Sequence, residues 1–226
     1  RPPPGPRRRL ARRASACCSL PRTGAGGVKR VCVLLAWSIA RDSRAQRTAR
    51  TMARHAQVDV FHVPDDAAGG GDPFEGVANV ALHAVARPER LLDRALRHTL
   101  YPLDARFLAD AVLSRGAGSG AAYDVVYAHD LPTAWPAARV ARRQGARLVY
   151  DVHDLAVETI DQGCPESVSP WRRLKHGFAR RVMRRSSAAW ERRFVRRADL
   201  VVTTTESYLA YLRERYGLRG GLVLPN

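Results

Sequence analysis

The sequence predicts an α/β protein whose core is a Rossmann-like, doubly wound sheet of mostly parallel strands. Short apolar runs of strand length alternate along the chain with longer helical patterns, and this alternation is typical of parallel sheets covered by helices. One continuous strand, helix, strand unit occupies residues 123–154, and no repeat of solenoid period occurs. The 46% hydrophobic content is sufficient for a substantial core.

The predicted elements follow one another in β-α order after residue 27. Residues 1–27 combine Pro, Arg, Gly and Ala without a period and are predicted to be a disordered basic tail, whereas 28–226 form the folded domain. The predicted strands are 28–36, 58–63, 77–85, 123–128, 147–152, 199–205 and 221–224. The predicted helices are 42–55, most of 87–114, 133–144 ending at Gly145, and 206–216. A further helix is predicted to begin at Ser169-Pro170 and to break at Ser186-Ser187. Loops are predicted at 65–73 and 155–169, and a flexible connector at 116–120.

The unit at 123–154 ends each of its strands in the same pair of residues, His129-Asp130 and His153-Asp154. Two parallel strands joined by a crossover helix point the same way, so both pairs are expected at the carboxyl edge, where open α/β sheets bind ligands. The simpler interpretation is that Asp130 only helps to begin the helix after Leu131-Pro132, with the histidines as surface or packing residues. The repetition of the pair on one edge favours a functional site.

The net charge of +17 is concentrated in two segments. Residues 1–27 contain seven arginines and no acidic residue, and residues 171–197 contain ten arginines, Lys175 and only Glu191, which leaves the remainder neutral. The part of the chain outside these two segments is therefore not predicted to be a general nucleic-acid-binding surface. The basic helical segment has two interpretations: contact with an anionic membrane, or a solvated face in an arginine-biased sequence.

Other classes of protein are disfavoured by what the sequence lacks. The four cysteines (17, 18, 32 and 164) show neither metal-ligand nor disulfide-rich spacing, and Cys32 is expected to be buried in a strand, which suits a reducing, cytoplasmic setting. The longest apolar run, 31–37, is too short to span a bilayer or to act as a signal peptide. Neither a G-x-G-x-x-G motif nor a P-loop is present, so the common dinucleotide and phosphate cradles are not expected.

Four segments follow one another in the sequence: 123–130, 148–154, Glu191 with 197–203, and 223–226. Together they resemble the amino-terminal domain of glycosyltransferase family 4, whose members are retaining, nucleotide-sugar-dependent enzymes of the GT-B fold. An Asp-x-Arg element, Asp42-Ser43-Arg44, also opens a helix after the first strand, as in part of that family. The resemblance extends over about residues 28–226.

The resemblance implies roles for particular residues. His153 is expected near the reacting sugar, as a catalytic residue but not as a nucleophile. The acceptor is expected to contact Asp42, Arg44, His129, Asp130, Asp154 and Glu158. A hydroxyl nucleophile needs acceptors that orient it, and a developing sugar cation with a departing diphosphate needs placed polar groups. No metal or other cofactor is expected beyond a UDP- or GDP-sugar as donor substrate.

The sequence departs from the family pattern at two points. The loop after the first strand lacks the glycine pair that many members carry, and the sequence ends at Asn226, where the linker to a second, donor-binding domain would begin. The chain is thus predicted to be the acceptor-binding half of a glycosyltransferase acting on a carbohydrate or lipid-linked acceptor, such as that of a cell-envelope polysaccharide, and inactive alone. The alternative is a non-catalytic binding module or split-enzyme subunit whose partner supplies the donor site.

For family members with lipid-linked acceptors, docking on the inner face of the membrane through basic, amphipathic surfaces would be expected. The candidate contact residues here are Arg172, Arg173, Arg180, Arg181, Arg184 and Arg185.

Overall fold

A computed structural model describes residues 29–65, 71–88, 103, 105–119, 122–160 and 170–225, with side chains for all of these except 116–119 and 170–176. The predicted tail at 1–27 lies outside the described residues, as do most of the helix predicted over 87–114 and the side chains of Arg172 and Arg173. The strands are β1 (Lys29–Leu34), β2 (Ala56–His62), β3 (Val80–Ala84), β4 (Val125–His129), β5 (Arg147–Val152), β6 (Leu200–Thr203) and β7 (Leu222–Val223). The helices are η1 (Ile39–Arg41), α1 (Ser43–Met52), α3 (Phe107–Ser119), α4 (Leu131–Gln144), α5 (Ala156–Thr159), α6 (Pro170–Arg197) and α7 (Glu206–Tyr216).

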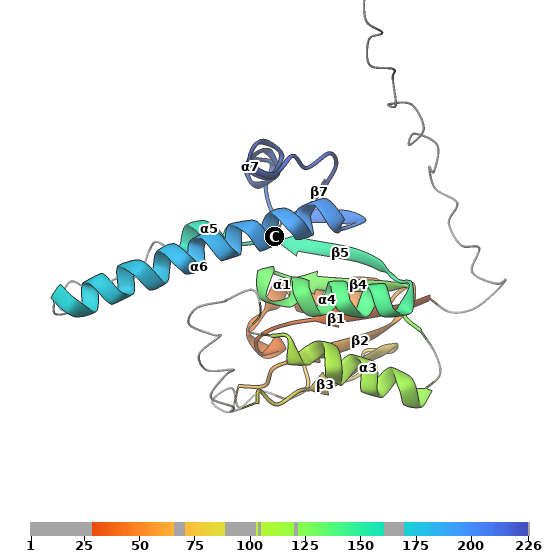
Figure 1. The fold of residues 1–226 in the computed structure, drawn as a ribbon. Helices are drawn as coiled ribbons and strands as arrows, with labels where there is room; N and C mark the ends of the chain where they lie inside the picture. The colour runs from red at the N-terminus through yellow and green to blue at the C-terminus, as the bar shows by residue number, and fades with distance from the viewer. Residues whose placement is uncertain are drawn as a thin grey trace, which may run out of the picture.

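The seven strands form one sheet in the order β3-β2-β1-β4-β5-β6-β7, and every neighbouring pair is parallel (Figure 1). The predicted doubly wound, Rossmann-like sheet is therefore confirmed. The chain runs from β1 outward through β2 to β3, then returns to β4 and runs outward on the other side. The reversal places the topological switch point between β1 and β4, where folds of this type bind ligands at the carboxyl ends of the strands.

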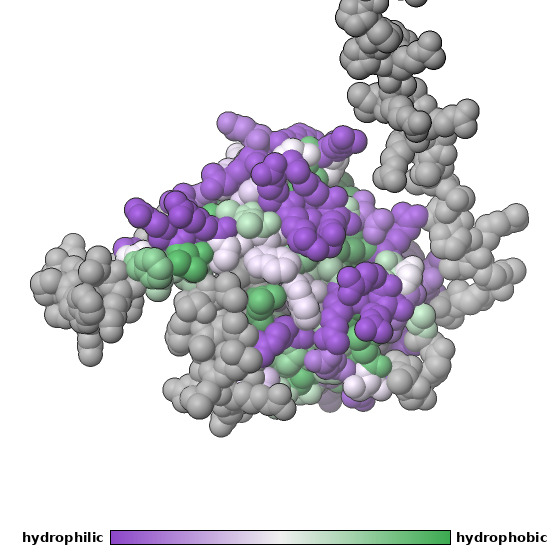
Figure 2. Space-filling model, in the orientation of Figure 1, coloured by the Kyte–Doolittle hydropathy of each residue, from purple (hydrophilic) through white to green (hydrophobic). Residues whose placement is uncertain are grey.

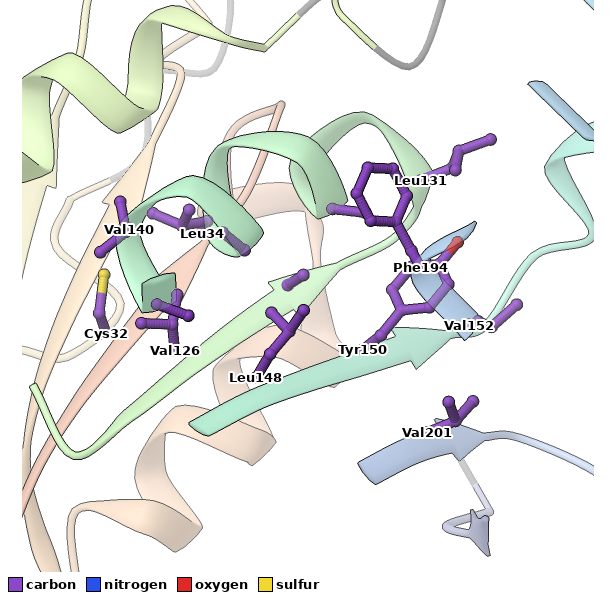
Figure 3. Close-up of a cluster of buried hydrophobic side chains, with 14 of the residues drawn as sticks. Cys32, Leu34, Val126, Leu131, Val140, Leu148, Tyr150, Val152, Phe194 and Val201 are labelled. Atoms are coloured by element: carbon purple, nitrogen blue, oxygen red, sulfur yellow. The ribbon is translucent and has the colours of Figure 1, made fainter. Parts of the chain in front are cut away.

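The core lies on both faces of the sheet because successive strand side chains point to opposite faces. In β1, Cys32 and Leu34 pack with α4 and the carboxyl-terminal part of α6, whereas Val31 and Val33 pack with α1. Figure 3 shows Phe194 of α6 beside Leu131, Tyr150 and Val152 in the first of these clusters. Cys32 is fully buried, as predicted.

Helix α6 differs from the sequence expectation. It continues without interruption through Ser186 and Ser187, where a break was predicted, and its amino-terminal part projects past the sheet (Figure 1). Serine side chains are tolerated inside a helix when they bond to the preceding turn, and Ser186 Oγ donates to the Met183 carbonyl over 3.0 Å. Apolar side chains of this projecting part are also not covered by the sheet, because Phe178 remains 72% exposed and Val182 38% exposed.

Other differences are local. The connector predicted over 116–120 is the end of α3, which continues to Ser119, since glycine lowers helix stability by only about 1 kcal/mol per residue and does not itself end a helix. A short helix, α5, lies within the loop predicted over 155–169. Helix α4 begins two residues earlier than predicted, at Leu131, and ends as predicted at Gly145, whose left-handed conformation caps it.

Candidate active site

A cleft of about 730 Å³ opens at the carboxyl ends of the central strands, beside the switch point. It is bounded by the loop after β1, the start of α1, and the residues that follow β4 and β5. Its lining residues are Trp37, Arg41, Asp42, Ser43, Arg44, Arg47, Asp130, His153, Asp154, Ala156 and Thr159. The parallel register pairs His129 of β4 with Asp151 of β5, so the two His-Asp pairs meet at one edge, as predicted.

Asp130 and His153 form the most constrained unit in the cleft. Asp130 Oδ2 lies 2.9 Å from His153 Nε2, and Oδ1 accepts a hydrogen bond from the His153 backbone N–H over 3.3 Å. Asp130 adopts φ 65° and ψ 173°, a region that is nearly restricted to glycine and costs about 1–3 kcal/mol for other residues. Its side chain does not cap α4, so the interpretation of Asp130 as a simple helix cap is wrong. Strain of this kind is concentrated at functional sites because the surrounding contacts must hold it in place.

His129 lies directly beneath this unit and is fully buried. Its ring centroid is 4.4 Å from that of His153, and its Nε2 is 2.9 Å from Asp42 Oδ2. Asp42 also caps α1 by accepting the Ala45 backbone N–H, and it accepts the indole N–H of Trp37 over 2.9 Å. The loop after β1 is thereby tied to the end of β4.

Asp151 is a site residue that the sequence did not predict. It is fully buried at the end of β5 and is held bidentately by Arg44, from Nη2 over 3.0 Å and from Nε over 3.2 Å. The Tyr127 hydroxyl donates to the same carboxylate over 2.8 Å, and His129 Nδ1 lies 3.5 Å away. Arg44 also donates to the Leu224 carbonyl, and so links α1 to β5 and to the segment after β7.

These contacts shift the pKa values of the buried groups in opposite directions. Burial by itself would lower the pKa of His129, but the carboxylates of Asp151 and Asp42 outweigh it and raise that pKa to about 9. Burial would raise the pKa of Asp42 and of Asp151, yet their hydrogen bonds with His129 hold both below the usual value. For Asp130, burial prevails over the hydrogen bond with His153, and the pKa is raised. His129 is therefore an imidazolium at neutral pH, placed between two carboxylates.

The raised pKa of His129 predicts a loss of stability in alkaline solution. Since the folded-state pKa of about 9 exceeds the usual 6.5, the contribution is complete below about pH 6.5 and disappears as the pH rises through 9. We expect the free energy of unfolding in urea to fall by roughly 3 kcal/mol between pH 6.5 and 10. The decrease should be much smaller in a His129→Gln variant, and an equal decrease in both proteins would contradict the assignment.

Within the described residues, two groups of side chains have ligand atoms close enough to hold a metal ion: Asp42, His129 and His153, and Asp130, His153 and Asp154. A histidine must be neutral to bind a metal, whereas the contacts of His129 favour its charged form. Each histidine also already has a carboxylate within 2.9 Å of its Nε2. The arrangement is therefore accounted for by hydrogen bonds, and the expectation of no metal cofactor stays a prediction.

The remaining predicted site residues are distributed over two places. Asp154 is exposed and lines the cleft next to His153. Glu158 does not line it; it accepts the Tyr211 hydroxyl over 2.7 Å and pairs with Arg184 over 3.5 Å, among α5, α6 and α7. Arg44 lines the cleft but directs its guanidinium to Asp151. The roles of all these residues toward an acceptor stay predictions.

Among the sequence similarities of the chain, one family model covers most of its length. The model is described as a glycosyl transferase 4-like domain and matches residues 42–226. The chain belongs to the glycosyl transferase 4-like domain family. The predicted resemblance to an amino-terminal GT-B domain is thereby confirmed.

Solved structures agree with this glycosyl transferase 4-like fold. Sucrose-phosphate synthase from Thermosynechococcus elongatus aligns with a TM-score of 0.54 at 15% identity, over 87% of this chain and 48% of that one. Arabidopsis thaliana UGT89C1 complexed with quercetin aligns with a TM-score of 0.56 at 10% identity, over 88% of this chain and 52% of that one. The same plant protein complexed with UDP-L-rhamnose gives 0.55 at 11% identity, with the same coverage. This chain thus spans about half the length of these structures, and no curated protein shows significant sequence similarity to it.

Proposed function

We propose that the chain is the acceptor-binding half of a retaining glycosyltransferase that transfers a sugar from a UDP- or GDP-sugar to a carbohydrate or lipid-linked acceptor. The observation that carries this proposal is the strained Asp130, which fixes His153 at the carboxyl edge next to the switch point. A surface or packing histidine would not need a partner whose backbone is held in a costly conformation.

The cleft offers the groups that glycosyl transfer requires. Asp42, Asp130 and Asp154 line the cleft with carboxylates, and His129, which does not line it, places a buried cation against Asp42. Carboxylates and ring nitrogens orient an attacking hydroxyl, and fixed charges stabilise the charge that develops on the sugar and the departing diphosphate. In this proposal His153 contacts the reacting sugar and is not a nucleophile, while Asp42, Asp130 and Asp154 face the acceptor.

The donor is assigned mainly to a second α/β domain that would face this cleft. Two observations support that assignment: the chain spans about half of the GT-B structures it matches, and UGT89C1 has been solved with UDP-L-rhamnose and with quercetin. The described loop after β1, Leu35 to Ser38, also contains no glycine that would let a diphosphate approach the backbone closely.

The proposal is tested by incubating the protein expressed from its complete coding sequence with UDP- and GDP-sugars and a panel of saccharide and polyprenyl-phosphate acceptors. We expect release of the nucleoside diphosphate together with a glycosylated product that keeps the anomeric configuration of the donor. Donor-independent binding of acceptors, without any product, would instead identify a non-catalytic binding module. A product of inverted configuration would contradict the retaining mechanism.

A peripheral membrane contact is proposed for the projecting part of α6. Figure 2 shows apolar and hydrophilic side chains side by side along this part of the helix. Phe178 and Val182 are exposed there at a helical spacing of four, with the exposed Arg181 and Arg185 beside them. Apolar and basic residues on one projecting helix suit binding to the interface of an anionic membrane. Among the described residues, no helix is long and apolar enough to cross a bilayer.

This contact predicts weaker vesicle binding in the variant Arg181→Ser/Arg185→Ser. Each arginine near an anionic surface contributes about 1 kcal/mol, so the partition coefficient for phosphatidylglycerol vesicles should fall by about thirtyfold. The matched control Arg213→Ser/Arg219→Ser removes the same charge from exposed positions outside α6. Equal vesicle binding by the two variants in a sedimentation assay would contradict the proposed membrane contact.

A further inference from the structure

A second concave site lies at the opposite edge of the sheet, between α4 and the carboxyl-terminal part of α6. This groove has a volume of about 420 Å³ and contains Arg139 and Arg142 from α4, Arg193 and Arg197 from α6, and two tryptophans, Trp135 and Trp190. We call it the Arg-Trp groove. Leu148, the second residue of β5, also borders it. At about 3.3 Å per residue, the strand separates this position from His153 by roughly 16 Å, so the groove is distinct from the candidate active site.

The two tryptophans hold guanidinium groups in place on the two sides of the groove. The Arg139 guanidinium lies 5.6 Å from the centre of the Trp135 ring, and that of Arg193 lies 5.8 Å from the Trp190 ring. Trp190 in turn stacks on the buried Phe194, with 5.6 Å between ring centroids. A guanidinium that already packs on an indole ring loses less conformational freedom on binding a ligand than one that is free in solvent. The groove is therefore preorganised for contact with an anion.

The charge in the Arg-Trp groove is not balanced by the protein. Arg139 pairs with Asp110 over 2.7 Å, but the guanidinium groups of Arg142, Arg193 and Arg197 form no hydrogen bond or ion pair with any residue of the described part of the chain. The acidic residue in the lining, Asp199, accepts the Leu148 backbone N–H over 2.8 Å. Arg193 and Arg197 are one helical turn apart, where like charges repel each other. An anion between the two helices would relieve this repulsion.

We infer that the Arg-Trp groove binds a compact multivalent anion, the phosphate or diphosphate group of a small soluble organic molecule. Arginine is the side chain suited to such groups because its planar fork binds two oxygens at once. The volume is in the range of small-molecule sites. The carboxyl-terminal part of the basic segment 171–197 borders the groove, whereas the projecting half of α6, with Phe178, lies outside it (Figure 1).

The test is a titration of the ¹⁵N-labelled chain with pyrophosphate at constant ionic strength, followed through the tryptophan indole signals. Trp135 and Trp190 report on the groove, and Trp37 reports on the cleft. We expect saturable shifts of the Trp135 and Trp190 signals. In the variant Arg193→Ser/Arg197→Ser the affinity should be at least about tenfold lower, because charge-assisted hydrogen bonds are lost. The control Arg213→Ser/Arg219→Ser should bind as the unchanged protein does.

Four results would overturn the inference. Shifts that do not saturate, or equal weakening in both variants, would show a diffuse charge effect. Saturation of the Trp37 signal alone would place the anion in the cleft. If phosphatidylglycerol vesicles shift the Trp135 and Trp190 signals but pyrophosphate does not, the arginines of the groove bind a lipid surface. Because the substituted arginines are exposed, both variants should retain the fold, which circular dichroism verifies.

Discussion

Replacing His153 with alanine should reduce sugar transfer by the protein expressed from its complete coding sequence by about a hundredfold or more. His153 is held at the cleft by both oxygens of Asp130: Oδ2 lies beside the imidazole Nε2, and Oδ1 accepts the His153 backbone N–H. The imidazole is therefore already in place when charge develops on the sugar. The loss of one preorganised polar group typically lowers the rate of transfer by about a hundredfold or more. Product formation at saturating donor, measured by mass spectrometry, gives the magnitude.

The matched control for His153→Ala is His55→Ala, because His55 is exposed after α1 and does not line the cleft. This control should keep the full rate. Both variants should unfold at the same temperature as the unchanged protein, within a few degrees. Full activity of the His153 variant would remove this residue from the reaction.

The second large effect is expected from Asp151→Ala, as a loss of stability of about 3–5 kcal/mol, which is typical when one partner of a buried ion pair is removed. The change leaves the buried Arg44 guanidinium without its bidentate partner and also removes the acceptor of the Tyr127 hydroxyl. His129 would also lose one of the two carboxylates that keep it charged, so its pKa should fall. Urea unfolding at pH 7 measures the first effect, and an NMR titration of the imidazole measures the second.

An exposed ion pair provides the comparison for Asp151. Asp110 pairs with Arg139 over 2.7 Å, but its side chain is 67% exposed. Asp110→Ala should therefore cost at most about 1 kcal/mol, as exposed pairs do. If the two substitutions destabilised the protein equally, the buried network would not hold the sheet edge together in the way described.

The order of the elements could be predicted from the sequence because apolar runs of strand length alternate with helical patterns. The bounds of β5 were predicted without error, since Arg147–Val152 is a mostly apolar run that begins two residues after the glycine cap of α4. The shape of α6 could not be predicted in this way. Its two serines suggested a break, but whether a helix continues depends on the packing of residues such as Phe194, which is a property of the tertiary structure.

The meeting of His129, Asp130 and His153 was predictable because parallel strands bring their carboxyl ends to one edge. Asp151 was not predicted, because its contact with His129 depends on the register of β4 and β5. An ionisable residue inside an apolar strand was the available signal, since such residues are almost never buried without a partner. Trp37 carried no comparable signal, and the position of Glu158 depends on how α6 and α7 lie.

The most direct test of the central claim, that the cleft around His153 binds the acceptor, is an NMR titration of the chain that follows the Trp37 indole signal. The indole N–H donates to Asp42 at the cleft wall, so a bound ligand must disturb it. Saccharide acceptors should shift this signal in a saturable way, and they should do so far more weakly in the His153→Ala variant, whereas UDP- and GDP-sugars alone should have little effect. If nucleotide-sugars saturate the Trp37 signal and no acceptor does, the cleft is a donor site and the account is wrong.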